Sequence, residues 1–93
     1  MAIVTSLVLD VLKTHEPNAL AFACQLADLD DTYNVNLLVQ EVDDKTQSII
    51  LKITGENLDF NAISQQIESM GGSVHSIDEV DVKGESPTST SEQ

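Results

Sequence analysis

Two histidines and the carboxylates near them are the side chains of this sequence best suited to chemistry, and the first group lies in the segment KTHEP at residues 13–17. There His15 and Glu16 come just before a predicted helix, and Asp10 lies on the strand that precedes them. Histidine can act as a base or a metal ligand near neutral pH, and the N-terminus of a helix favours anions. The alternative is a capping loop in which Thr14 or Glu16 satisfies free backbone N–H groups of the helix.

A second group lies on a predicted strand, SVHSIDEVDV, at residues 73–82. Because side chains alternate across a strand, we expect His75, Glu79 and Asp81 on one face and Asp78 on the other. If this strand neighbours the first strand of the chain, it also comes close to Asp10. Carboxylates with one imidazole suit calcium, magnesium, manganese or zinc. The alternative is a charged edge strand whose acidic side chains resist pairing with other chains.

Asp43 and Asp44, with Glu41 close by, form a third acidic group, which we interpret first as a turn and only second as a cation site. No catalytic or cofactor motif accompanies these groups: the sequence contains no GxSxG elbow, HExxH pair, EF-hand loop, P-loop or GxGxxG fingerprint. Cys24 is the single cysteine, and its apolar neighbours predict a small core residue. We therefore expect no enzymatic activity and no organic cofactor.

The composition limits the partners that this chain can have. Its 93 residues are enough for one domain, and its formal net charge is -12, with four lysines and no arginine. Binding to nucleic acids and to anionic membranes rests on basic residues, so the composition excludes both as partners. The charge fits cation binding, a basic protein partner or an acidic solvated surface. The N-terminal apolar run has no basic region before it and is too short to span a membrane, so we expect a cytoplasmic protein.

Hydrophobic periodicity predicts six elements in the order strand-helix-strand-strand-helix-strand. β-Branched and aliphatic residues predict the strands, at 3–12, 34–42, 47–54 and 73–82. Pro17 fits the first turn of the first helix. The apolar stripe of this helix is so broad that we expect little of its surface to face water: Ala19, Leu20, Phe22, Ala23, Cys24, Leu26, Ala27 and Leu29. Asp59 is the expected N-cap of the second helix, which Gly71 and Gly72 end.

This order is typical of the α+β ferredoxin-like fold, in which an antiparallel four-stranded sheet carries two helices on one face. We assign the domain to residues 1–82 and expect the acidic, Ser/Thr-rich tail 83–93 to be disordered. Aliphatic side chains occur on both faces of the predicted strands, whereas a half-exposed antiparallel sheet should have a polar face. We therefore expect a second subunit to cover the open face, which makes the protein a homo-oligomer.

Two motifs carry a family resemblance: LDVLKTHEP near the start of the chain and GENLDFNAISQQIESMGGSVHSIDEV in its second half. With their spacing, they resemble the domain of unknown function 211 family, found chiefly in archaea, over residues 3–82. The resemblance implies a ferredoxin-like fold, ring-like homo-oligomers, no established enzymatic activity, and bound divalent cations, calcium especially. The residues that match the family's motifs are Asp10, Lys13, His15, Glu16, Pro17, His75, Asp78 and Glu79.

Our first hypothesis is a non-enzymatic, cytoplasmic, ring-forming protein that binds a divalent cation, calcium before magnesium, manganese or zinc. Its candidate ligands are Asp10, His15, Glu16, His75, Asp78 and Glu79. The alternative is a small-molecule-sensing regulatory module with a ligand site between subunits, by analogy with other ferredoxin-like modules. A third hypothesis is an enzyme that uses His15 or His75 as general base, but neither histidine has a series of partner residues in the sequence.

Overall fold

The computed structural model describes residues 2–84, which form four strands and two helices in the predicted order strand-helix-strand-strand-helix-strand. The elements are β1 (Ile3–Thr14), α1 (Ala19–Ala27), β2 (Asn34–Val42), β3 (Thr46–Thr54), α2 (Phe60–Ser69) and β4 (Gly72–Lys83). They form one sheet with the strand order β2-β3-β1-β4, and each neighbouring pair is antiparallel. The predicted ferredoxin-like α+β fold is confirmed. Of the predicted disordered tail, Lys83 belongs to β4, and residues 85–93 lie outside the described part of the chain.

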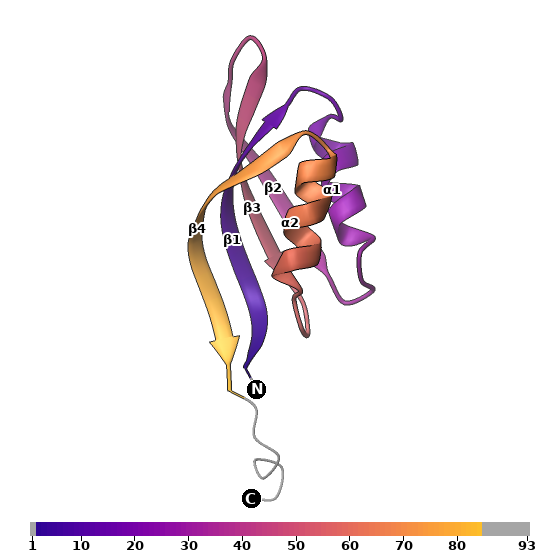
Figure 1. The fold of residues 1–93 in the computed structure, drawn as a ribbon, viewed down its shortest axis with the longest axis vertical. Coiled ribbons are helices and arrows are strands. Elements are labelled where there is room, and N and C mark those ends of the chain that lie inside the picture. Colours follow the sequence, from indigo (N-terminus) through magenta and orange to yellow (C-terminus); the bar gives the residue numbers. More distant parts are fainter. Residues whose placement is uncertain (1, 85–93) are drawn as a thin grey trace, which may run out of the picture.

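Both helices pack on the same face of the sheet, and the core lies between the two layers (Figure 1). Because side chains alternate across a strand, every second residue of the central strands points into this core. From β1 and β3 these buried residues are Leu7, Leu9, Val11, Ile49, Leu51 and Ile53. The helices contribute Phe22, Leu26, Ile63 and Ile67. The core is therefore built almost entirely from aliphatic side chains.

Each helix begins at a side-chain cap. The Oδ1 atom of Asp59 accepts a hydrogen bond from the Ala62 N–H at 3.1 Å, as predicted for α2. In α1 the cap is Asn18, whose Oδ1 accepts from the Ala21 N–H at 2.9 Å. The prediction that Pro17 lies in the first turn of this helix is wrong, because Asn18 is the N-cap, its side chain accepts from the free Ala21 N–H, and the helix starts one residue after it.

Helix α1 buries a narrower stripe than its sequence suggests. Phe22 and Leu26 are fully buried, but Leu20 is 74% exposed and Cys24 is exposed. The predictions of a core cysteine and of a mostly covered helix are both wrong. A helix that lies on one side of a sheet turns only one stripe toward it, and within residues 2–84 no other element packs on the outer side of α1.

Strand β4 pairs with β1 over nearly its whole length, but not in one continuous register. The pairing shifts between Val8 and Leu9, and again between Asp10 and Val11, so that β4 has one extra residue at each place. These extra residues are Asp78 and His75, which have no direct partner on β1. Each shift is a β-bulge, which increases the local twist and changes where the neighbouring side chains point.

Candidate functional site on the open face of the sheet

The face of the sheet opposite the helices, here named the open face, has no covering layer within the described residues (Figure 1). On β1 the residues that point to the open face alternate with the buried core residues, and Asp10 is one of them. The register places Asp10 between Ile50 of β3 and Ser76 of β4. A half-buried carboxylate thus lies near the middle of the open face.

The two bulges bring acidic and imidazole side chains of β4 onto this same face. At a bulge, two residues of one strand lie opposite a single residue of the other. The Ser76 Oγ–H, opposite Asp10, donates to Oδ1 of Asp78 at 2.7 Å, so Ser76 and Asp78 lie on the same side of the strand. Glu79 lies opposite Val8, which is also an open-face residue. The prediction that Asp78 lies on the other side of the sheet from Glu79 is wrong, because simple alternation does not hold across a bulge.

A cavity of about 260 Å³ lies on the open face beside Asp10. It is lined by Asp10, Leu12, Glu41, Asp43, Ser48 and His75. The expectation that the first and last strands are neighbours, and so bring Asp10 close to His75, is confirmed. The structure also adds Glu41 and Asp43 to this group, whereas their sequence positions predict a separate acidic turn.

The loop after β1 reaches the same region by a different contact. The His15 ring places Nε2 at 2.7 Å from the backbone carbonyl oxygen of Asp43, which links this loop to the β2–β3 hairpin. The Thr14 Oγ–H donates to the carbonyl oxygen of Glu16 at 2.9 Å, while the Glu16 side chain stays exposed. The loop is therefore held by hydrogen bonds, but neither Thr14 nor Glu16 caps α1, because Asn18 has that position. His15 lies beside a cavity residue without lining the cavity itself.

Lys13 is the polar residue that sequence reasoning left without a role. It is 1% exposed, and its Nζ donates to the Thr14 carbonyl oxygen at 2.8 Å and to Oε1 of Gln47 at 2.9 Å. The ammonium also lies 5.5 Å from the centre of the Phe22 ring. Burial lowers the pKa of Lys13, while the nearby Glu16 carboxylate acts in the opposite direction. Every second residue of β1 points toward the helices, and Lys13 follows Leu9 and Val11 in this alternation, so the strand pattern indicates its burial.

One chain does not present a complete metal site. Within residues 2–84, no three His, Cys, Asp or Glu side chains lie close enough together to hold one ion. The residues around the cavity are nevertheless of the right type, since carboxylate oxygens suit calcium and magnesium and an imidazole suits zinc. A cation at this cavity would need further ligands from a rearranged side chain or from another molecule.

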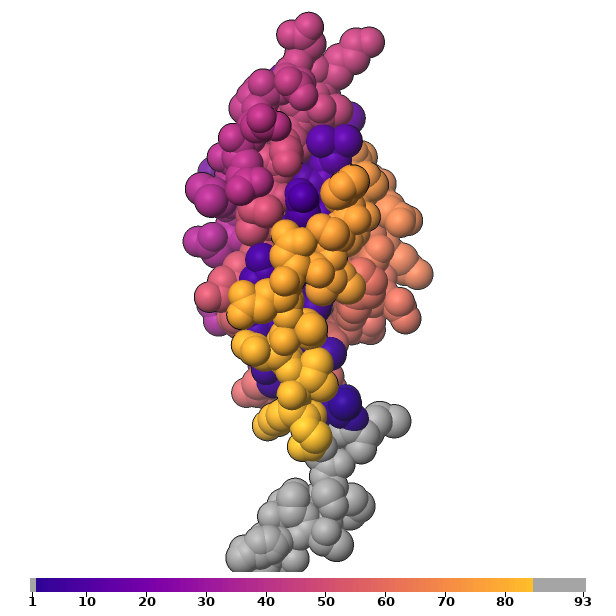
Figure 2. All heavy atoms as spheres, turned by 90° about the vertical axis from the view of Figure 1, so that its left-hand side faces the viewer, coloured from indigo at the N-terminus to yellow at the C-terminus, as the bar shows by residue number. Residues whose placement is uncertain are grey.

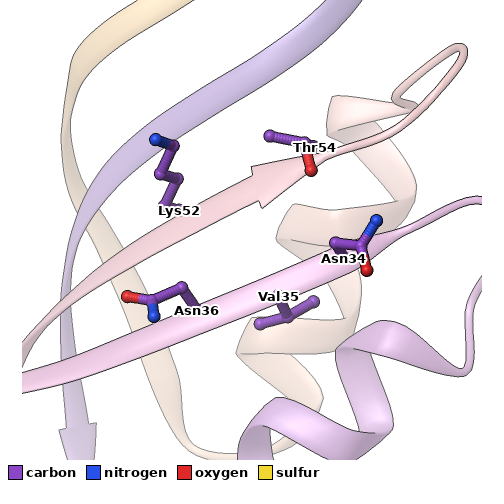
Figure 3. A pocket seen from close by; sticks show the side chains of 5 residues that line it. All are labelled: Asn34, Val35, Asn36, Lys52 and Thr54. Atoms are coloured by element: carbon purple, nitrogen blue, oxygen red, sulfur yellow. The ribbon is translucent and has the colours of Figure 1, made fainter.

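A second hollow, of about 560 Å³, lies at the start of β2 (Figure 3). It is lined by Asn34, Val35, Asn36, Lys52 and Thr54, with β2 and β3 side chains opposite one another in the register. Its lining is neutral except for Lys52. The hollow is therefore different in charge from the acidic cavity beside Asp10.

Apolar side chains are exposed on both faces of the sheet. On the open face, Leu12 and Leu38 are exposed, and Leu38 pairs with the half-buried Ile50. We name Leu12, Leu38 and Ile50 the open-face strip. On β4, Ile77, Val80 and Val82 are each about half exposed, and we name them the β4 strip. Figure 2 shows β4 crossing its side of the molecule with no other described segment over it.

Comparisons with known proteins point to one family. The family model for domain of unknown function 211, described as "Uncharacterized ArCR", matches residues 5–93. An uncharacterized protein from Methanocaldococcus jannaschii is 47% identical over 74 residues, which are 80% of this chain and 76% of that protein. Among the described residues, no helix is long and apolar enough to cross a membrane.

Proposed function

The chain belongs to the domain of unknown function 211 family, and from that premise we propose that it is a subunit of a ring-like homo-oligomer that binds divalent cations, calcium first. In this proposal the protein is cytoplasmic, has no catalytic activity and needs no organic cofactor. Its main partner is a second copy of itself. The observation that carries the proposal is the pair of exposed apolar strips, which lie on different faces of the sheet.

The β4 strip lies on the helix side of the sheet. Cross-strand partners share a face, and the partners of Ile77 and Val80 on β1 are the buried residues Leu9 and Leu7. The strip is exposed because the end of β4 extends past both helices (Figure 1). The open-face strip lies on the other side, across β1, β3 and β2. Burial of apolar area stabilises association by about 25 cal/mol per Å² before the costs of binding are subtracted.

Two different strips favour a head-to-tail contact. When one patch of a subunit packs on a different patch of the next, repetition gives a closed ring or an open filament. The β4 strip of one copy against the open-face strip of the next is such a contact. In this contact Asp78 and Glu79 point away from the neighbouring copy, because they lie on the open face of their own sheet, on the same side as Asp10.

The cation belongs at this contact. A chain with net charge -12 repels its own copies, and the open-face side of the contact contains the carboxylates of Asp10, Glu41 and Asp43 around the cavity. A divalent cation bound among these carboxylates offsets the repulsion, and a further ligand from the neighbouring copy supplies what one chain lacks. The assembly then becomes more stable as the free cation concentration rises, because the ion binds the assembled form.

Native mass spectrometry of the purified protein, with and without prior chelation, tests the proposal. We expect one closed oligomer whose mass contains whole-number calcium increments that chelation removes. The substitution pairs Asp10→Asn/His75→Gln and Asp78→Asn/Glu79→Gln should remove these increments. The pair Glu56→Gln/Glu68→Gln, which removes two exposed carboxylates away from the open face, should keep them. A closed oligomer without any ion would retain the ring and refute the cation site.

The apolar contact has its own test. Ile77→Asp/Val80→Asp places two charges in the β4 strip and should convert the oligomer to a monomer. Leu20→Asp is the matched control, since Leu20 is 74% exposed on α1 and belongs to neither strip. A wild-type protein that is monomeric with or without calcium would contradict the proposal as a whole.

A further inference from the structure

Strand β2 forms one edge of the sheet, and its outer backbone groups pair with no other described strand. Residues 34–40 of this strand, NVNLLVQ, contain no charged residue and no proline. Proteins usually protect an edge strand from pairing with charged side chains, prolines or bulges. The pairing of β2 with β3 has one irregularity, after Val39. Over Asn34–Val39 the edge of β2 is thus regular and unprotected.

The other edge of the sheet differs in each of these respects. Strand β4 contains the two bulges at His75 and Asp78, which interrupt a regular backbone edge. It also carries the acidic side chains Asp78, Glu79 and Asp81 close together. Two copies of β4 placed edge to edge would bring these carboxylates together. Of the two edges, β2 is the one that has a segment without carboxylates, residues 34–40, along which two acidic chains can pair without direct repulsion.

The sequence of β2 is self-complementary about Leu37. In an antiparallel pair of β2 strands related by a two-fold axis at this residue, Val35 lies opposite Val39 and Asn36 lies opposite Leu38. One face of the pair is then entirely apolar, because Val35, Leu37 and Val39 are all half-buried residues that pack against the core. Each exposes part of its side chain at the edge, where a second strand would cover it.

The surface beside β2 is shaped for the same arrangement. Leu38 is 58% exposed on the open face, and the hollow of about 560 Å³ lies next to Asn36, two residues earlier (Figure 3). Two-fold pairing about Leu37 puts Leu38 of the second copy opposite Asn36, next to this hollow. The first carboxylate beyond the segment, Glu41, falls opposite Tyr33 and so does not meet its own copy.

We propose that β2 pairs edge to edge with β2 of a second copy, about a two-fold axis at Leu37, and joins two four-stranded sheets into one. This inference rests on the self-assembly proposed above. It adds a second contact to the head-to-tail contact described there. Edge pairing uses backbone groups, whereas the head-to-tail contact uses side chains of the sheet faces, so both can exist in one assembly. The interface is isologous, since the same strand contributes from each copy.

Cysteine cross-linking tests the register. In a Cys24→Ser background, Asn36→Cys/Leu38→Cys places two thiols directly opposite each other across the proposed interface. Opposite Cα atoms in antiparallel strands are roughly 4.5–5.5 Å apart, which is within the range of a disulfide. We expect nearly complete conversion to a covalent dimer on a non-reducing gel after mild oxidation. Both positions are exposed, so the substitutions leave the core unchanged.

The single variants Asn36→Cys and Leu38→Cys are the matched controls. In the proposed register each thiol then lies diagonally from its copy, roughly 7–8 Å away, which is too far for a disulfide. Both should therefore stay largely uncross-linked. A native oligomer whose double variant fails to cross-link would overturn the β2 pairing and leave the self-assembly in place. A protein that is monomeric by native mass spectrometry, with no cross-link, would overturn both.

Discussion

Lys13 is a charged residue in a buried position, where lysine is rarely found. An isolated buried ammonium is strongly unfavourable, and here two acceptor oxygens and an aromatic ring compensate for part of that cost. The hydrogen bond to Gln47 joins the end of β1 to the start of β3, close to the loop that carries His15. Lys13 is thus a structural neighbour of the candidate site, and it holds the end of β1 beside the hairpin.

The stability of the protein should depend on pH through Lys13. Its pKa is lowered from 10.5 by burial, so above the folded-state pKa the unfolded chain binds more protons than the native protein. The cost of the buried charge is fully present below the folded-state pKa, and it disappears as pH rises toward 10.5. We expect the free energy of unfolding of the wild type, relative to that of Lys13→Met, to increase over this window in urea titrations.

The exposed Lys45 provides the control for this prediction. The increase measured relative to Lys13→Met should exceed any change measured relative to Lys45→Met over the same pH values, since Lys13 is buried and Lys45 is exposed. A difference between wild type and Lys13→Met that stays constant with pH would contradict the assigned effect of burial.

At the scale of elements, the turn from α2 into β4 decides where the last strand starts. Gly71 has φ of +83°, in the left-handed region of backbone conformation that residues other than glycine rarely adopt. Its carbonyl oxygen accepts a hydrogen bond from the Thr14 N–H at 3.4 Å, which ties this turn to the end of β1. The same turn therefore sets the start of the β1–β4 pairing, on which the position of His75 depends.

Gly71→Ala should destabilise the fold. The left-handed conformation costs an L-residue about 1–2 kcal/mol, and a Cβ atom at this position would lie 2.7 Å from Oγ1 of Thr14. Thr14 cannot turn away freely, because its hydroxyl donates to Glu16. Thermal unfolding measures the loss, and Gly84→Ala is the control, since a Cβ atom there meets nothing within 4 Å. Equal stability of the two variants would show that the turn tolerates a side chain.

At the scale of the whole molecule, the dominant property is charge. The chain has 16 acidic and four basic residues, and one of the four, Lys13, is buried. Few cations therefore remain on the surface to offset the carboxylates. A net charge this far from zero destabilises the compact state through self-repulsion, and any assembly of copies increases that repulsion.

Chloride salts should stabilise this protein. Raising the ionic strength from about 0.01 M to about 1 M shortens the screening length from roughly 30 Å to roughly 3 Å, which removes most of the repulsion between surface carboxylates. We expect the melting temperature to rise with potassium chloride. The rise should be smaller in Asp28→Asn/Asp31→Asn/Glu68→Gln, which removes three exposed charges away from the candidate site. A melting temperature that is independent of salt would contradict the repulsion argument.

The order of the elements, their approximate bounds and the cap Asp59 were predictable from the sequence, because each depends on local periodicity and local hydrogen bonding. So was the pairing of the first and last strands, which follows from the fold class. The cap at Asn18 was missed, since Pro17 and Asn18 are adjacent and both suit a helix start. The exposure of Cys24 was missed for a different reason: an apolar stripe shows which residues can be buried, but not whether another layer exists to bury them.

Only the tertiary structure shows that the residues of the candidate site lie around one cavity. Asp10, Asp43 and His75 are far apart in the sequence, and they surround one cavity because β1 lies between β3 and β4 in the sheet. The positions of His75 and Asp78 also depend on two bulges, which arise where two strands must keep different lengths in register. Residue type and periodicity therefore determined the fold of this chain, whereas the arrangement of its possible ligands was decided by long-range strand pairing, which local sequence patterns do not encode.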